Sequence, residues 1–206
     1  MAVPRAAIPV RAATPADSAV VAAALARAFI DDPVLAYLFP DAATRPRKLT
    51  QFFALIVATE ANAGDTLIAG DGAAATIWRA PGRWQTPVSA MLRHAVPMIA
   101  TFGLGLRRAL RLQAVVDAHH PATPHWYLAF AGCDPALHGR GFGGAAIRAR
   151  LRDCDAAGLP AALETANEAN LAIYAALGFA VTETYDAAPG LAMWSMWREP
   201  ARQIVR

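Results

Sequence analysis

The second half of the chain alternates between apolar runs of strand length and segments with the apolar spacing of a helix. Strands are predicted at residues 125–133, 161–165, 179–186 and 191–198, and helices at residues 141–157 and 168–177. Strands that alternate with helices in this way predict an α/β fold, with a mixed sheet and helices on its faces.

The first half of the chain has a weaker periodicity but clear start and turn signals. Thr14 followed by Pro15 is typical of a helix start. The segment Gly70-Asp71-Gly72 is typical of a turn between two strands. The first half is therefore predicted to contain a strand at 6–12, helices at 14–29 and 45–61, a short apolar piece at 34–39, and a hairpin of strands 66–69 and 73–79.

Residues 87–116 predict one or two helices, interrupted at Pro97. This segment is too short to enclose a core of its own. We therefore expect one domain over residues 1–206, with a helical insert at about residues 87–117.

Charge and hydropathy argue against two classes of partner. The net charge is +3, and the only dense basic run, Arg107, Arg108 and Arg111, fits a solvated helix face, so we expect no nucleic-acid partner. The longest apolar run, residues 95–106, has twelve residues. A membrane-crossing helix needs ~20, so we expect no membrane association.

The cysteines and histidines show no metal-binding pattern. Cys133 and Cys154 lack a C-x-x-C spacing, which favours a reduced, cytoplasmic protein. The histidines His119, His120 and His125 have no cysteine or acidic partner at ligand spacing, so we expect no metal site.

A glycine-rich loop at residues 138–144 lies between a predicted strand and a predicted helix. Its glycines allow positive φ and close approach of a ligand, and the N–H groups at a helix start attract anions, so the loop predicts a phosphate site. Gly139, Gly141 and Gly144 also match the dinucleotide motif G-x-G-x-x-G, with Glu164 as its acidic residue. That motif opens a βαβαβ unit, which the two closing strands do not fit. A tight turn without a ligand is the remaining alternative.

The loop and the segments around it resemble the GNAT family of N-acetyltransferases. The family's Q/R-x-x-G-x-G/A loop is matched by His138-Gly139-Arg140-Gly141-Phe142-Gly143, with histidine at the first position. Residues 163–170 and 173–179 are similar to the family's second cofactor segment. Residues 71–78, with the helical insert after them, resemble the puromycin N-acetyltransferase group.

The resemblance implies a central, mostly antiparallel sheet with a splayed parallel strand pair, helices on both faces and a helical insert before the fourth strand. It also implies acetyl-CoA as the acetyl donor, an amine as the acceptor, and a monomer or homodimer. The coenzyme A site is expected to comprise Ala131, Gly132, Cys133, His138, Gly139, Arg140, Gly141, Phe142, Gly143, Gly144, Asn167, Asn170 and Tyr174. Of these, Asn167 is placed to cap the next helix, and Asn170 and Tyr174 lie four residues apart on one helix face.

The predicted reaction is direct attack of a neutral amine on the thioester, with a backbone N–H near Gly132 stabilising the oxyanion. Tyr174 resembles the family's general acid. A phenol of pKa about 10 transfers its proton to a thiolate of pKa about 8.5 uphill by roughly 2 kcal/mol, so a hydrogen bond to the thiolate is favoured.

Many relatives in the family have a glutamate base in the strand before the loop. That strand has no carboxylate in this chain, so the base is expected among carboxylates elsewhere. Glu164 is the first candidate, and a structural role for it is equally compatible with the sequence. Asp31, Asp32 and Glu60 follow, and water alone serves an amine of low pKa. An acetylated Cys133 is disfavoured because it has no adjacent base.

The acceptor pocket is expected to draw on Phe29, Tyr37, Phe39, Trp78 and the insert, which suggests a small aromatic or apolar amine. Two alternatives stay open: acetylation of a protein or peptide, and a catalytically silent acyl-CoA-binding module.

Overall fold

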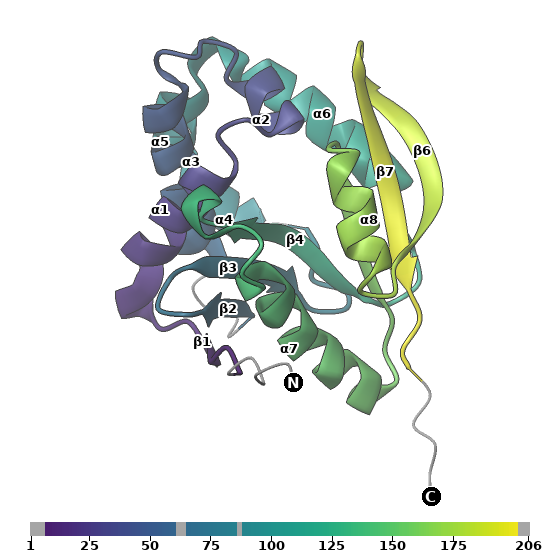
Figure 1. Ribbon diagram of the computed structural model, residues 1–206. Helices are drawn as coiled ribbons and strands as arrows, with labels where there is room; N and C mark the ends of the chain where they lie inside the picture. Colours follow the sequence, from purple (N-terminus) through teal and green to yellow (C-terminus); the bar gives the residue numbers. More distant parts are fainter. Residues whose placement is uncertain (1–6, 61–64, 86–87, 202–206) are drawn as a thin grey trace, which may run out of the picture.

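A twisted sheet runs through the protein and carries helices on both faces (Figure 1). The computed structural model describes residues 7–60, 65–85 and 88–201. Seven strands form the sheet within these ranges: β1 (Val10–Ala12), β2 (Thr66–Ala69), β3 (Ala74–Arg79), β4 (Trp126–Cys133), β5 (Ala161–Thr165), β6 (Ala180–Ala188) and β7 (Leu191–Arg198). Their order is β1-β2-β3-β4-β5-β7-β6, and β4 with β5 is the parallel pair among antiparallel neighbours. The predicted sheet is thereby confirmed.

The parallel pair parts soon after it forms. In the described chain its ladder consists of Trp126 opposite Ala161 and Tyr127 opposite Ala162. Beyond these residues β4 stays with β3 as far as Cys133, and β5 stays with β7 as far as Thr165. The sheet therefore splits into two halves, as the predicted splayed pair requires.

Helices α1 (Ser18–Ala28) and α3 (Arg45–Glu60) cover one face of the sheet, and α7 (Phe142–Ala157) covers the other. On α3 the buried residues are Leu49, Phe52, Phe53 and Val57, a spacing that places them on one helix face. They pack with Leu25 of α1 against β3. The remaining helices of the main fold are the short α2 (Pro33–Leu38) and α8 (Ala169–Ala175).

The insert between β3 and β4 forms three helices in the described residues: α4 (Val88–Arg93), α5 (Ala95–Phe102) and α6 (Leu106–His119). The predicted break at Pro97 is wrong. Pro97 lies in the first turn of α5, where its missing N–H costs no intrahelical hydrogen bond. The breaks fall instead at His94 and at the turn Gly103–Gly105. Pro87, the predicted start, lies outside the described residues.

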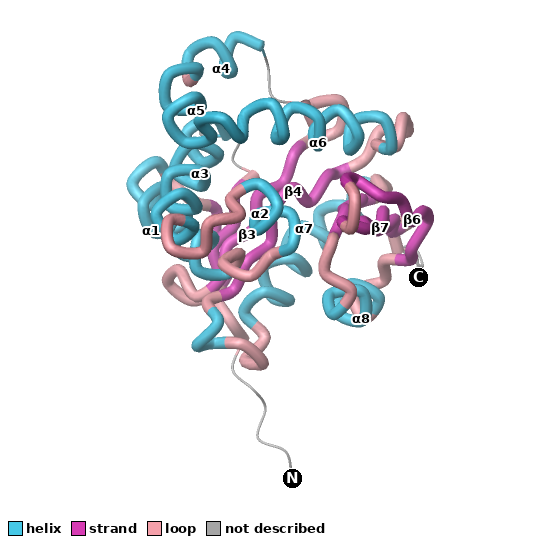
Figure 2. Tube along the Cα trace, turned by 90° about the horizontal axis from the view of Figure 1, so that it is seen from above, coloured by secondary structure: helices cyan, strands magenta, loops and turns pink. Residues whose placement is uncertain are grey.

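Helix α6 joins the two halves of the protein. It runs from α5 across to β6 when the molecule is viewed from above (Figure 2). At its far end His119 Nδ1 lies 2.9 Å from Glu183 Oε1 of β6. Neither α6 nor any other helix of the described residues is long and apolar enough to cross a membrane.

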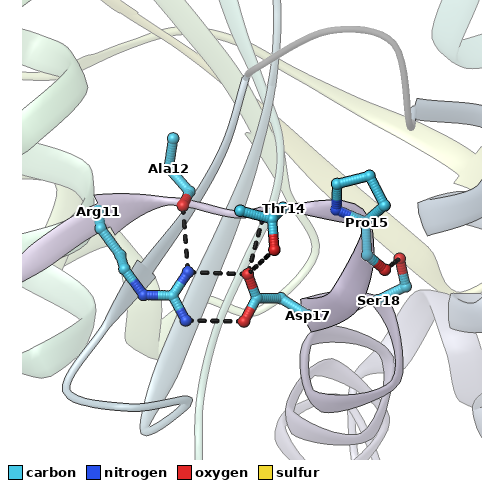
Figure 3. A network of polar contacts seen from close by, with 6 residues as sticks. All are labelled: Arg11, Ala12, Thr14, Pro15, Asp17 and Ser18. Atoms are coloured by element: carbon cyan, nitrogen blue, oxygen red, sulfur yellow. Dashed lines mark hydrogen bonds and ion pairs between the residues drawn. The ribbon is translucent and has the colours of Figure 1, made fainter.

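A polar network fixes the passage from β1 into α1 (Figure 3). Asp17 Oδ2 accepts hydrogen bonds from the Thr14 backbone N–H and hydroxyl, both at 2.7 Å. Both Asp17 oxygens also accept from the Arg11 guanidinium, at 2.8 and 2.7 Å. These bonds, led by that from Arg11, hold the pKa of Asp17 well below its ordinary value. The helix-start signal at Thr14-Pro15 is thus confirmed, through a short 3₁₀ turn, Pro15–Asp17.

A second ion pair joins the end of α7 to β7. Arg198 donates from Nη1 to Asp155 Oδ1 at 2.7 Å and from Nη2 to Oδ2 at 2.9 Å. The same carboxylate accepts the Ala201 N–H at 2.7 Å. The hydrogen bonds from Arg198 are the main cause of a lowered pKa of Asp155.

We predict that Asp155→Asn lowers the free energy of unfolding at pH 7 by about 2 kcal/mol, because a charged, two-pronged pair is lost. The folded pKa of Asp155 is depressed, so its stabilisation is complete above the unfolded value of ~3.9 and disappears as the pH falls through the folded value. Urea denaturation at pH 7 and at about pH 2.5 measures both effects. Asp153→Asn is the control, since that side chain is 67% exposed. Equal stability of the two variants at pH 7 would contradict the prediction.

Candidate functional site

A cavity of about 640 Å³ lies where β4 and β5 part. Its size is typical of sites for small ligands. Strand β4 contributes residues 129–131, β5 contributes Glu164 and Thr165, and α8 contributes Asn170 and Tyr174. Helices α5 and α6 of the insert wall it with apolar side chains that include Met98, Phe102, Leu106, Ala109 and Leu112. The cavity therefore has a strand side that carries polar groups and a mostly apolar helical side, to which Gln113 and Asp117 add polar groups.

The glycine-rich loop leads directly into α7. Gly139 and Gly141 have φ of 73° and 89°, values that favour glycine, and Gly141 is the N-cap of the helix. The first N–H groups of an α-helix have no acceptor within the helix, so this terminus presents donors to an anion. The predicted phosphate site therefore has the required backbone geometry, with α7 beginning at Phe142.

Two side chains of the loop contact neighbouring parts of the protein. His138 Nε2 lies 3.1 Å from the Cys133 carbonyl oxygen, so this ring nitrogen donates to the end of β4. The ring of Phe142 packs against Gly70, where a Cβ atom would lie only 2.3 Å from it. The side chain of Phe142 thus packs away from the loop, so that only its backbone can contact a ligand there. The side chain of His138 supports the loop. Arg140 is exposed.

Cys133 is part of the loop's support. Burial raises the pKa of its thiol, whose sulfur lies 3.6 Å from the Asp134 carbonyl oxygen and 3.9 Å from that of Leu137. A protonated thiol is a poor nucleophile. The structure therefore favours the non-covalent route expected from the sequence.

Helix α8 carries its two predicted residues into the cavity. Asn167 Oδ1 accepts the Ala169 N–H at 3.1 Å in the turn before α8, but the N-cap of the helix is Glu168, one residue later than predicted. Asn170 and Tyr174 both line the cavity. Burial, with a smaller effect of the Asp32 charge, raises the pKa of Tyr174 to about 12. Transfer of its proton to a thiolate of pKa about 8.5 is then uphill by about 5 kcal/mol, so hydrogen bonding without transfer is favoured more strongly.

The carboxylates differ in their access to the cavity. Asp32 lines it, accepts the Leu35 N–H at 3.0 Å, and has a pKa raised by burial. Glu60 lies 2.7 Å from Arg79 in an ion pair, and Asp31 is exposed. Glu164 lines the cavity and remains the carboxylate nearest to the split between the strands.

Glu164 belongs to a buried polar cluster that the sequence did not reveal. Its Oε1 lies 3.6 Å from Nδ1 of His120, the residue that caps the C-terminal end of α6, and the two side chains are 2% and 1% exposed. The Tyr127 hydroxyl donates to Glu164, and burial followed by the Glu164 charge raises the Tyr127 pKa well above its ordinary value. The sequence analysis considered His120 only as a metal ligand. In the described residues no three metal-binding side chains gather.

The residues predicted to contact the acceptor do not all line the cavity. Phe29 lines the cavity. Tyr37 lies 5.4 Å beneath the Arg108 guanidinium, between α2 and α6 and outside the cavity lining. Phe39 stacks on Phe102 at 5.3 Å and is buried.

The prediction that Trp78 contacts the acceptor is wrong. Trp78 is 0% exposed and packs with Ile147, Leu151 and Cys154, on the α7 face of the sheet. Its indole N–H donates to Thr76 Oγ1 at 3.2 Å. Alternation along β3 turns Trp78 away from Ile77, which faces α1 and α3, and therefore away from the cavity.

Comparison with known proteins finds relatives both in sequence and in structure. No family model matches the chain. An uncharacterised N-acetyltransferase of Schizosaccharomyces pombe is 30% identical over 169 residues, which cover 77% of this chain and 68% of that protein.

Two solved structures share the fold at low identity. One is the structure described as histone acetyltransferase HPA2 and related acetyltransferase from Corynebacterium glutamicum. It aligns with a TM-score of 0.71 and 22% identity, and the alignment covers 97% of this chain and 99% of that chain. The other, arylalkylamine N-acetyltransferase 2 of Aedes aegypti, aligns with a TM-score of 0.63 and 10% identity over 94% and 99%. None of the three is named a puromycin N-acetyltransferase, so that narrower resemblance stays a prediction.

Proposed function

Because this chain belongs to the GNAT family of N-acetyltransferases, we propose that it transfers an acetyl group from acetyl-CoA to the amine of a small acceptor. One observation carries the proposal: the split between β4 and β5 opens a cavity that Tyr174 and Glu164 line from different elements. In such a cavity one group can act on the leaving thiolate while another acts on the amine.

The residues present fit coenzyme A. The start of α7, with Gly139 and Gly141 at positive φ, offers backbone N–H groups to a pyrophosphate. Beyond Tyr127 the edge of β4 that faces β5 is outside the ladder, so Ala131 to Cys133 can hydrogen-bond the amides of a pantetheine arm as an added strand would. Acetyl-CoA bound there supplies the activated carbonyl and the thiolate leaving group. His138 and Asn167 then serve as supports of the site.

The protein's own groups divide the remaining work. Tyr174 donates a hydrogen bond to the leaving sulfur, because its high pKa opposes full proton transfer. Backbone N–H groups near Gly132 stabilise the developing oxyanion. Glu164 provides the negative charge that balances the positive charge of the acceptor amine as it loses its proton.

The shape of the cavity supports a small acceptor. Helices α5 and α6 wall the cavity, whereas a peptide substrate calls for an open groove. The apolar side chains on this wall and Phe29 favour an aromatic or apolar amine. The fold shared with an arylalkylamine N-acetyltransferase is consistent with such an acceptor.

A screen of amines tests the function. Release of free thiol from acetyl-CoA, measured over aromatic, aliphatic and peptide amines, is expected to identify small amines as acceptors. A protein that binds acetyl-CoA but releases no thiol with any amine would favour the catalytically silent module instead.

We predict that Tyr174→Phe lowers kcat at least tenfold and changes coenzyme A affinity by less than about twofold, because only the hydrogen bond to the leaving sulfur is lost. Steady-state thiol release and calorimetry measure the two effects. Tyr37→Phe is the control, since Tyr37 lies outside the cavity lining. Full activity of Tyr174→Phe would remove Tyr174 from the mechanism.

The two ends of α7 offer a matched pair of variants. Gly141 and Gly158 cap this helix with φ of 89° and 64°, and no atom lies within 3.4 Å of a Cβ built on either. Alanine at either position is expected to lower the free energy of unfolding by about 1–2 kcal/mol. We predict that Gly141→Ala alone weakens coenzyme A binding, by at least tenfold, because it alters the phosphate loop. Equal coenzyme A affinities of the two variants in calorimetry would refute the loop assignment.

A further inference from the structure

Three buried polar atoms of the cavity lining have no hydrogen-bond partner within the described part of the chain: Nδ1 and Nε2 of His120 and Oε2 of Glu164. Burial of such atoms without partners is costly, and in native proteins it often marks a site of function. Both side chains line the cavity, so a bound molecule with N–H groups is able to satisfy Nε2 of His120 and Oε2 of Glu164.

The imidazole of His120 is held in a defined orientation. The indole of Trp84 stacks on it with ring centroids 3.8 Å apart and planes 17° apart. Trp84 is held in turn, because its carbonyl oxygen accepts a hydrogen bond from Arg79 at 2.6 Å, and Arg79 is paired with Glu60. The ring of Tyr127 meets His120 edge-on at 4.9 Å. This packing fixes the ring that Glu164 approaches.

The pair lies within the split of the sheet. Glu164 is two residues past Ala162, the last β5 residue paired with β4, or ~7 Å into the split. Tyr174 and Asn170 border the same cavity. His120 and Glu164 therefore share one cavity with Tyr174, the residue proposed to act on the leaving sulfur.

We propose that His120 is a catalytic residue, the acceptor of the amine's proton, and that Glu164 positions it. This inference rests on the proposed acetyl transfer and assigns the proton step within it. Nδ1–H of His120 points to Glu164 Oε1, and Nε2 faces the acceptor. One N–H bond of the acceptor's ammonium group breaks, and an Nε2–H bond forms on His120. The amine nitrogen keeps the electron pair of the broken bond and can attack the thioester. The carboxylate of Glu164 balances the positive charge of the imidazolium. An aliphatic amine needs this step, because only about one molecule in a thousand is neutral at pH 7.4.

Charged and titratable side chains surround His120, and they lie on several neighbouring helices and strands. They are Asp117 on α6, Arg79 on β3, His125 before β4, Tyr127 on β4, Glu164 on β5 and Tyr185 on β6. Arg79 is paired with Glu60, and burial lowers the pKa of His125, which favours the neutral form of that ring. Glu164 is therefore the nearest counter-charge to a protonated His120.

The test compares His120→Gln with His119→Gln over a range of pH. His119 is the next residue on the same helix, but it pairs with Glu183 and stacks on Tyr185 outside the cavity lining. We expect His120→Gln to lower kcat about 100-fold at pH 7 and to move the acid limb of kcat to higher pH, because the reaction then depends on amine that solvent has deprotonated. His119→Gln is expected to keep the wild-type limb. A uniform loss at every pH, with an unmoved limb, would indicate a structural role and overturn the proposal.

A second readout needs neither cofactor nor activity. In ¹⁵N spectra of the free protein above neutral pH, with the His120 signals assigned by their loss in His120→Gln, we expect Nδ1 to carry the proton and Nε2 to be bare. A dominant Nε2–H tautomer would overturn the pairing with Glu164. Absence of thiol release from the wild-type protein would instead count against the proposed function, and wild-type activity with equal profiles for both variants would count against His120 alone.

Discussion

The parting of β4 from β5 is the constraint on which the rest of the site depends. Each strand is held firmly on its other side, β4 by its pairing with β3 and β5 by its pairing with β7. The two halves of the sheet therefore keep their own hydrogen bonds while the edge between them stays open beyond Tyr127 and Ala162. An open edge in the middle of a sheet exposes backbone groups that a ligand can pair with.

The helices on the two sides of the split contribute different chemical groups. The glycine-rich start of α7 presents backbone donors, and α8 brings Asn170 and Tyr174 to the cavity. Helix α6 closes the opposite side and ends at His119, which is paired with Glu183 of β6. The insert thus both walls the cavity and brings His120 to Glu164.

Local patterns were enough to predict much of the fold. Strands β5 and β7 begin and end at the predicted residues, because their apolar runs are bounded by turn residues. The glycine-rich loop and the hydrogen bond of the Asn167 side chain before α8 were also predictable, since their residue types are favoured by backbone geometry within a few positions. The insert was predicted less well, because a proline in the first turn of a helix leaves the same sequence signal as one that ends a helix.

Contacts between distant segments were not predictable. Trp78 was assigned to the acceptor site because it is aromatic, but the face of β3 on which it lies depends on how α7 packs. His120 was overlooked because its relation to Glu164 depends on the path of α6 across the split, which no local pattern encodes. Residues that act through the backbone were therefore easier to find than those that act through side chains from different elements.

The central claim is that the loop before α7 and the split beside it bind coenzyme A. Thermal unfolding with coenzyme A, acetyl-CoA, NAD or NADP tests it most directly, because a ligand present at 100 times its Kd stabilises the folded state by about 2.7 kcal/mol. The account predicts that coenzyme A and acetyl-CoA raise the unfolding temperature and that the dinucleotides leave it unchanged. Stabilisation by NAD or NADP without stabilisation by coenzyme A would contradict it.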